Sequence, residues 1–217
     1  MNILDKLLDY IFPPVCGICG IINEKYICDS CYYEIKKLEI SRIIKNNSKY
    51  YSSYLYLFKY EGMIRDKIID YKFNDKSYLY STFVEILLRN QKCKRYIKSF
   101  DIIIPVPISN KRMKERGYNQ CELITKEISK KLNIQTDSKL IRKSLDNKPQ
   151  SSLNKTERID NVKNVYSINT EKTNLIKNTK VLIFDDIYTT GSTVNEISRV
   201  LKQNGASDIG ILTISKD

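Results

Sequence analysis

Hydrophobic and polar residues follow two different periods along this chain, and together the two periods predict a mixture of strands and helices. Runs of consecutive apolar residues, which are typical of strands buried on both faces, occur over residues 101–108, 181–184 and 209–214. An aromatic-rich and partly alternating run over residues 50–60 indicates a further strand. These four segments are the expected strands of one sheet.

Between these runs, apolar residues recur every three or four positions, as amphipathic helices require. This spacing predicts helices over residues 64–73 and 79–89, a third helix after Asn119, and a fourth that begins near Val194 and closes at Gly205. Strands that alternate with helices in this way predict an α/β fold, with a mostly parallel sheet flanked by helices.

Two polar segments interrupt the pattern. A loop that carries Lys111, Arg112 and Arg116 is expected after the strand that stops at Pro107. Residues 142–166 are polar, contain proline and lack periodicity, and long irregular segments of compact domains are often functional. Two interpretations of this second segment remain open, a mobile loop over an active site and a plain surface excursion.

Four cysteines near the amino terminus have a spacing that predicts a metal site. They follow the pattern C-x2-C-x8-C-x2-C, and Gly17 and Gly20 permit tight turns that direct both thiolates of a pair at one ion. Four sulfur ligands with no open position are typical of structural zinc. The alternatives are two disulfides, or four cysteines without a common partner. The expected ligands are Cys16, Cys19, Cys28 and Cys31.

The length of 217 residues accommodates one full domain and a small appendage. We expect a four-cysteine zinc-finger domain over residues 1–48 and a larger domain over residues 49–217. No stretch approaches the roughly 18 uncharged apolar residues that a membrane-spanning helix needs. The expected location is the cytoplasm, where thiols stay reduced and paired cysteines favour metal over disulfide.

Charge and composition restrict the chemistry. The formal net charge of +12 favours a polyanionic partner such as nucleic acid or a phosphorylated small molecule. The abundance of Lys, Ile, Asn and Tyr follows equally well from AT-rich codons, so the charge alone leaves both interpretations open. Histidine is absent, which excludes a histidine base, nucleophile or metal ligand. Any chemistry therefore depends on carboxylates, lysines, thiols or a cofactor.

The segment FDDIYTTGST, residues 184–193, places two adjacent carboxylates and a turn of small residues between a buried strand and a helix. Backbone amides and hydroxyls at a helix N-terminus bind phosphate, and glycine permits close approach. Ribose hydroxyls would then reach Asp185 and Asp186. The alternative is a threonine-capped turn that serves stability alone. The expected phosphate-binding residues are Thr189, Thr190, Gly191, Ser192 and Thr193.

This segment resembles the motif with which type I phosphoribosyltransferases bind phosphoribosyl pyrophosphate (PRPP). Together with further motifs in the same order, the chain resembles the ComF family of bacterial competence proteins, and the resemblance covers nearly its whole length. The further motifs are the cysteine pairs, FKYEG (58–62), PVP (105–107), ERGYNQ (115–120) and the run from Arg142 through Gln150 and Arg158 to Asn161.

The resemblance implies a type I phosphoribosyltransferase fold behind a zinc finger, PRPP bound with Mg²⁺, and a role in DNA uptake during natural transformation. It also suggests an ATP-driven DNA translocase, a competence DNA helicase, as partner. Two functions remain open. One is transfer of the phosphoribosyl group to an acceptor that the sequence does not identify. The other is a non-catalytic accessory protein that holds single-stranded DNA and uses the fold as a scaffold.

Carried over by position, Asp185 and Asp186 would hold the ribose hydroxyls as catalytic residues, and residues 189–193 would hold the 5-phosphate. The loop after Pro107 would face the pyrophosphate, and Mg²⁺ would bridge pyrophosphate and ribose oxygens. The pyrophosphate-facing residues would be Ser109, Lys111 and Arg112.

Several polar residues keep two interpretations each. Those of the ERGYNQ segment either serve the site or cap and brace the following helix. Those of the 142–166 segment either close over bound PRPP or contact DNA phosphates. Cys93 and Cys121 are expected to be packed without a chemical role. The first set is Arg116, Asn119 and Gln120, and the second is Arg142, Gln150 and Arg158.

Overall fold

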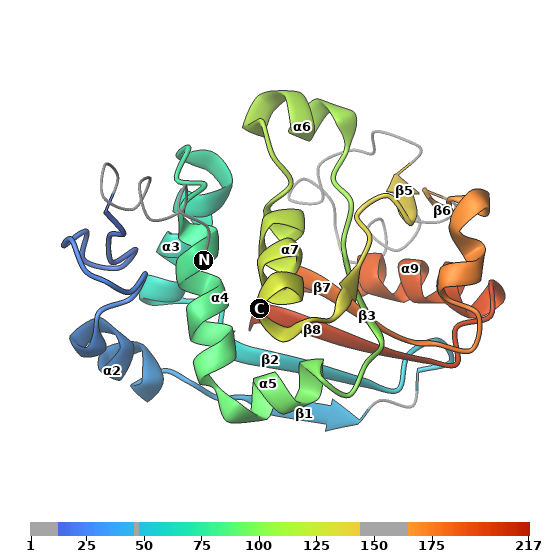
Figure 1. Ribbon diagram of the computed structural model, residues 1–217, viewed down its shortest axis with the longest axis horizontal. Coiled ribbons are helices and arrows are strands. Elements are labelled where there is room, and N and C mark those ends of the chain that lie inside the picture. Colours follow the sequence, from blue (N-terminus) through green and yellow to red (C-terminus); the bar gives the residue numbers. More distant parts are fainter. Residues whose placement is uncertain (1–12, 46–47, 144–164) are drawn as a thin grey trace.

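The computed structural model describes residues 13–45, 48–143 and 165–217, and it shows one central sheet with helices on both faces (Figure 1). The sheet has the strand order β1-β2-β8-β7-β3-β4. β1 runs antiparallel to β2, whereas every other neighbouring pair is parallel, so the mostly parallel sheet is confirmed. The strands are β1 (Arg42–Lys45), β2 (Ser53–Lys59), β3 (Ile102–Pro105), β4 (Gln135–Thr136), β7 (Lys180–Tyr188) and β8 (Asp208–Lys216).

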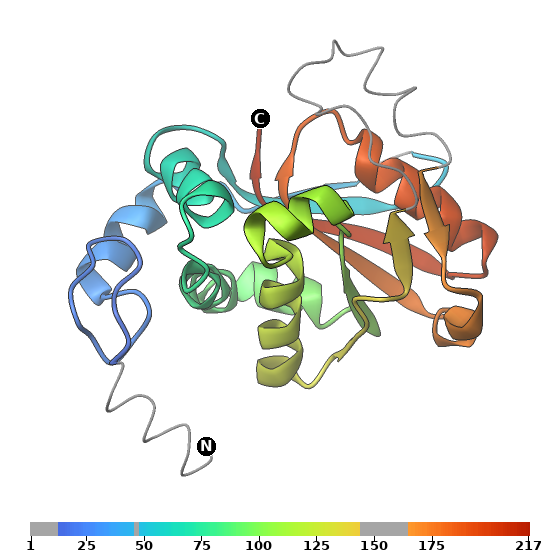
Figure 2. The same ribbon diagram turned by 90° about the horizontal axis from the view of Figure 1, so that it is seen from above.

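Different helices cover the two faces of the sheet (Figure 2). One hydrophobic core lies between the sheet and the helices α3, α4, α5 and α7. The other lies beneath α9 and a small antiparallel ladder of β5 and β6. The elements are α3 (Gly62–Phe73), α4 (Leu79–Arg89), α5 (Gln91–Ile97), α7 (Gln120–Leu132), α9 (Ser192–Gln203), β5 (Ile141–Lys143), β6 (Tyr166–Ile168) and the 3₁₀ helix η2 (Thr170–Leu175).

The predicted helices and strands are present, and the largest difference within a strand concerns β7. We expected this strand to stop at Phe184, but it continues to Tyr188 because it stays paired with β8 as far as Lys216. The two acids therefore lie inside the strand rather than after it. Because the sheet holds the backbone of both acids, it fixes the position from which each carboxylate side chain extends.

The prediction of a loop after Pro107 is wrong, because residues Asn110–Arg116 form the short helix α6, which projects from the body in Figure 1. Its N-cap is Ser109, whose hydroxyl accepts a hydrogen bond from the amide of Arg112, and it ends at Gly117 with φ of 77°. None of its residues is buried. A helix without a buried face has no hydrophobic period, which is why the sequence pattern did not reveal it.

The cysteine-rich region packs directly on the rest of the chain. Its helix α2 (Asp29–Lys37) follows the second cysteine pair. Cys16, Ile27 and Ile35 belong to the same hydrophobic core as the side chains of α4. β1 precedes residue 48 and yet pairs with β2 of the main sheet. The division at residue 48 stays a prediction, and packing is continuous across it.

Backbone and side-chain hydrogen bonds attach this region to α4. The amide of Tyr26 donates to Glu85 Oε2 at 2.9 Å, and Thr82 Oγ1 donates to the carbonyl oxygen of Tyr26 at 2.8 Å. Gly17 allows the backbone of this region to pack closely against α4, since a Cβ at residue 17 would lie 2.2 Å from Thr82 Oγ1. Gly20 makes the expected turn with φ of +79°. No helix in the described ranges is long and apolar enough to cross a membrane.

Candidate functional site

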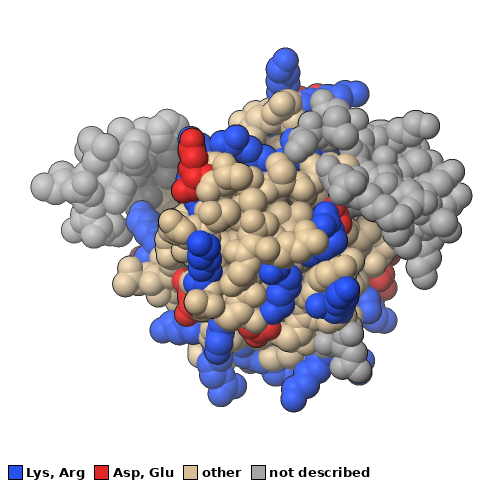
Figure 3. Space-filling model, turned by 90° about the vertical axis from the view of Figure 1, so that its right-hand side faces the viewer, with Lys and Arg blue, Asp and Glu red and all other residues tan. Residues whose placement is uncertain are grey.

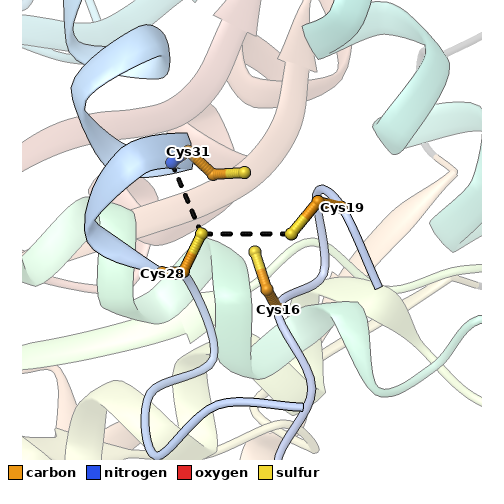
Figure 4. Close-up of side chains that lie close together, drawn as sticks. All are labelled: Cys16, Cys19, Cys28 and Cys31. Carbon is orange, nitrogen blue, oxygen red and sulfur yellow. Dashed lines mark hydrogen bonds between the residues drawn. The ribbon is translucent and has the colours of Figure 1, made fainter. Parts of the chain in front are cut away.

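The four cysteines of the amino-terminal region converge, as Figure 4 shows. Cys16 and Cys19 come from a turn, whereas Cys28 is the N-cap of α2 and Cys31 lies in its first turn. All four sulfur atoms lie within 4.8 Å of one another, and the Cys19 and Cys28 sulfurs are 3.9 Å apart. None of the four forms a disulfide.

This geometry fits a structural zinc ion. Zinc–sulfur bonds of about 2.3 Å in a tetrahedron place the sulfurs about 3.8 Å apart, close to the separation of the nearest pair. Burial raises the pKa of the Cys16 thiol, but hydrogen bonds from backbone amides of Cys19, Cys28 and Ile18 outweigh burial and bring the pKa to about 7. A thiol that loses its proton near neutral pH is a ready metal ligand.

The acid pair lies on β7 just beyond the carboxyl end of the neighbouring strand β3, whose last residue, Pro105, pairs with Phe184. Asp186 is 3% exposed, whereas Asp185 is partly exposed. Lys72 Nζ, from the last turn of α3, is 2.7 Å from Asp186 Oδ1, and Gln120 Nε2 donates to Asp186 Oδ2 at 2.9 Å. Asp186 is therefore held by donors from two helices of one face.

The ionisation of Asp185 is perturbed by its surroundings. Burial, together with the adjacent Asp186 carboxylate, raises the pKa of Asp185 to about 7, although Lys72 opposes this shift. The Cys121 sulfur is 3.7 Å from Asp185 Oδ1. Burial and the charges of Asp186 and Asp185 raise the pKa of Cys121, so this thiol is a neutral neighbour. Cys121 thus lies within the site, whereas Cys93 is packed in the core as expected.

The phosphate-binding segment forms a turn between β7 and α9. Gly191 is the N-cap of α9 with φ of 74°, and Thr190 Oγ1 lies 3.0 Å from Ser192 Oγ. A small concavity includes Asp185 and most of this turn. Asp185 and most of the turn therefore line one concavity, and the binding roles expected for the acids and the turn stay a prediction. The concavity is lined by Asp185, Ile187, Tyr188, Thr189, Gly191, Ser192, Thr193 and Val194.

A set of tyrosines supports the turn from the sheet. The Tyr188 ring stacks on Tyr54 with centroids 4.7 Å apart, and its hydroxyl lies 3.0 Å from the hydroxyl of Tyr51. A Cβ at Gly191 would lie 2.3 Å from the Tyr188 hydroxyl oxygen. The stacked Tyr188 ring therefore lies against the turn and fills the space that a side chain at residue 191 would need.

The residues expected to face pyrophosphate have different environments. Ser109 is buried as the α6 cap, and Lys111 is exposed with its Nζ 3.9 Å from Glu115. Arg112 lines a polar depression together with Lys72 and further residues of α3 and α6. Of the three, Arg112 alone shares a described concavity with a residue that contacts the acid pair.

The ERGYNQ segment divides between its two interpretations. Asn119 is buried and caps α7, since its side chain accepts from the amide of Cys121 and donates to the carbonyl oxygen of Val106. Gln120 instead contacts Asp186, and Arg116 donates to the Gln120 side chain. Asn119 is thus a structural cap, whereas Gln120 and Arg116 belong to the surroundings of the acid pair.

The segment expected to close over the site is described only at its ends. Arg142 is exposed on β5, opposite Ser167 of β6. Gln150 and Arg158 lie outside the described residues. Lys72 is a site residue that the sequence interpretation missed, because its helix carries no motif and its contact with Asp186 spans 114 residues.

The chain is similar to several known proteins. The family model of the phosphoribosyl transferase domain matches residues 119–217. Competence protein F of Haemophilus influenzae is 28% identical over 94% of this chain and 85% of that protein. Competence protein ComFC of Bacillus subtilis is 26% identical over 92% of this chain and 77% of that protein. DNA utilization protein YhgH of Escherichia coli O157:H7 is 34% identical over 51% of this chain and 47% of that protein.

Proposed function

The chain belongs to the ComF family, and we propose that its phosphoribosyltransferase domain binds PRPP with Mg²⁺ and that the protein acts in DNA uptake. The competence role follows from the names of the two relatives that match more than 90% of this chain. A competence DNA helicase or translocase is the protein partner that this role suggests, and the cytoplasm is the compartment in which such a protein would work.

One observation carries the PRPP proposal: a single strand, β7, leads from an acid pair directly into a turn at the N-terminus of α9. Helix N-termini attract phosphate through free amides and the helix dipole. Carboxylates accept hydrogen bonds from vicinal hydroxyls. A ribose 5-phosphate unit would place its phosphate on residues 189–193 and its hydroxyls on Asp185 and Asp186.

Magnesium suits this site because it is bound through carboxylates and substrate phosphates rather than by an all-protein cage. Bound there, it would neutralise charge on the leaving pyrophosphate. The chain's own contribution would be to orient the ribose through Asp185 and Asp186 and to hold its 5-phosphate at the α9 turn. Phosphoribosyl transfer would also require an acceptor nucleophile, in addition to the groups that hold PRPP.

Calorimetric titration of the zinc-loaded full-length protein with PRPP and Mg²⁺ tests the proposal. We expect the double variant Asp185→Asn, Asp186→Asn to lose at least 100-fold in affinity, because charge-assisted hydrogen bonds contribute about 1.5–3 kcal/mol each. Asp101→Asn is the matched control, since Asp101 is exposed at the opposite end of the sheet. A well-folded wild type without PRPP binding would reject the proposal.

A second candidate function, binding of single-stranded DNA, is favoured by an exposed tyrosine beside the cysteine cluster. Tyr33 on α2 is 63% exposed, and Lys37 Nζ lies 4.7 Å from its ring centroid. By contrast, the tyrosines of β2 are buried and unavailable for stacking. Figure 3 shows a face on which Lys and Arg are spread among uncharged side chains rather than gathered in one stripe. The buried tyrosines of β2 are Tyr54 and Tyr56, and Tyr51 just before the strand is buried as well.

Titration of the protein with labelled single-stranded DNA at several salt concentrations tests this function. Stacking contributes about 1–3 kcal/mol per base, so Tyr33→Ala should weaken binding by about five- to 100-fold. Tyr78→Ala, which removes another exposed tyrosine, should leave binding unchanged. Binding that is absent, or that does not weaken with salt, would reject the function, because phosphate contacts release counterions.

A further inference from the structure

Lys72 is a largely buried cation that comes from a helix without any recognised motif. Its side chain is 16% exposed, and that of its partner Asp186 is 5% exposed. The second oxygen of Asp186 accepts a hydrogen bond from Gln120, and each carboxylate oxygen keeps a further lone pair. The ammonium group therefore contacts the acid that we assign to the ribose, on the side of the sheet covered by α3 and α7.

Stability alone does not explain a lysine at this position. Desolvation of an ion costs several kcal/mol, and buried ion pairs often contribute no more stability than apolar side chains of similar volume. The Lys72 side chain retains some exposure and is among the residues that line the polar depression between α3 and α6. A ligand in this depression would therefore approach the same side chain that holds Asp186.

The depression gathers further positive charge. Arg112 and Arg116 line it with Lys72. Among the described residues, neither guanidinium forms an ion pair with a carboxylate; Arg116 donates to Gln120 and lies over the Phe73 ring. Burial lowers the pKa of Arg116; the Asp186 carboxylate opposes this shift, and the proximity of Arg112 adds to it. Cations held close together in this way are stabilised by an anion. The remaining lining residues are Phe73, Asp75 and Glu115.

The depression and the α9 turn flank the acid pair. Lys72 reaches Asp186 from α3, whereas the turn leads into α9, and these two helices cover opposite faces of the sheet. PRPP carries a monophosphate at one end of its ribose and a pyrophosphate at the other. With the monophosphate on the turn and the ribose on the acids, the pyrophosphate would extend toward Lys72.

Building on the proposed binding of PRPP, we infer that Lys72 recognises the pyrophosphate end of the ligand, beside Arg112 and Arg116, while it keeps Asp186 in place. A ligand without pyrophosphate would then depend on Asp186 but not on the charge of Lys72. This difference separates recognition from a purely structural role.

Three variants of the zinc-loaded full-length protein test the inference, each titrated with PRPP and with ribose 5-phosphate in the presence of Mg²⁺. Lys72→Gln removes the charge but retains a hydrogen-bond donor for Asp186. Lys72→Arg retains the charge. Lys76→Gln removes a nearby charge from a residue that is 41% exposed and pairs with Asp70. Circular dichroism and zinc content confirm that each variant is folded.

We expect Lys72→Gln to weaken PRPP binding about 10- to 100-fold, the range for one lost charge-assisted contact. Ribose 5-phosphate binding should change less than about threefold, Lys72→Arg should restore most PRPP affinity, and Lys76→Gln should match wild type. Equal losses for both ligands, no loss for either, or a Lys72→Gln variant that fails to fold while Lys72→Arg binds no better, would overturn the inference. A wild type that binds no PRPP rejects the proposed function itself.

Discussion

The cysteine cluster and the acid pair are assembled in opposite ways. The four sulfurs come from residues 16–31 and meet through two short turns and the start of α2. The acid pair depends on partners from distant parts of the chain, since Lys72 and Gln120 lie 114 and 66 residues from Asp186. The first site is built locally and attached to the core, whereas the second exists only when the whole sheet is formed.

The largest expected effect is on the local site. Cys16→Ser should abolish stoichiometric zinc and lower the melting temperature by about 10 °C or more, because metal binding free energy is folding free energy and Cys16 is fully buried in the shared core. Thermal unfolding with measured metal content checks this. Cys93→Ala, a buried thiol outside the cluster, should keep its zinc. Zinc lost without a change in melting temperature would contradict structural attachment.

Gly191→Ala should have the next largest effect. It should weaken ligand binding at the second site, where the turn follows the acid pair. A left-handed conformation costs a non-glycine residue about 1–3 kcal/mol, and the stacked Tyr188 leaves no space for a Cβ. We expect at least tenfold weaker PRPP binding by calorimetry. Gly205→Ala is the control, since it has φ of +96° at the far end of α9 and only Lys177 nearby. Equal losses of affinity in both variants would count against a specific turn geometry.

The pH dependence of the free energy of unfolding should report on the ionisation of Asp185. The folded pKa of Asp185, about 7, exceeds its ordinary value of 3.8, so the folded protein retains a proton that the unfolded chain has lost. The free energy of unfolding should therefore decrease as pH rises from about 4 to about 7, by on the order of 2 kcal/mol. Urea unfolding of wild type and Asp185→Asn across this range isolates the effect, because their difference cancels zinc-linked changes. Parallel profiles would show that Asp185 does not titrate as inferred.

A smaller effect should come from the contact between the two regions. Thr82→Val removes the hydroxyl that donates to the Tyr26 carbonyl oxygen, and it should lower the free energy of unfolding by about 1 kcal/mol. Denaturant unfolding measures this change. Thr125→Val, whose hydroxyl bonds within its own helix to Glu122, should cost less. If zinc affinity stays unchanged in Thr82→Val, the cluster holds its metal independently of α4.

Sequence reasoning succeeded where the determining contacts are local. The spacing of Cys16, Cys19, Cys28 and Cys31 predicted their convergence, because a few residues of turn fix it. Continuous apolar runs predicted the buried strands, and the adjacency of the acids to the turn followed from their position on one strand. The predicted length of β7 was wrong, because the strand ends where its pairing with β8 ends and not where the run of apolar side chains ends.

The remaining features depend on tertiary contacts that no local pattern encodes. Lys72 resembles any polar residue at the end of a helix until α3 packs beside β7. Cys121 was expected to be packed without a chemical role, yet the packing of α7 against β7 places its sulfur 3.7 Å from Asp185 Oδ1. α6 carries no buried side chain, so hydrophobic spacing could not reveal it. Lys72 and Cys121 were missed because another part of the chain supplies their environment.

The position of β1 has a practical consequence for anyone who shortens the chain. β1 covers the outer side of β2, whose sequence SYLYLFK is aromatic and almost entirely buried. β1 itself presents the exposed cations Arg42 and Lys45 at the sheet margin. A fragment that began at residue 49 would uncover the unpaired backbone of an apolar strand, the usual template for intermolecular strand addition. Such a fragment would be a source of aggregates, whereas a fragment that kept β1 would retain a charged margin.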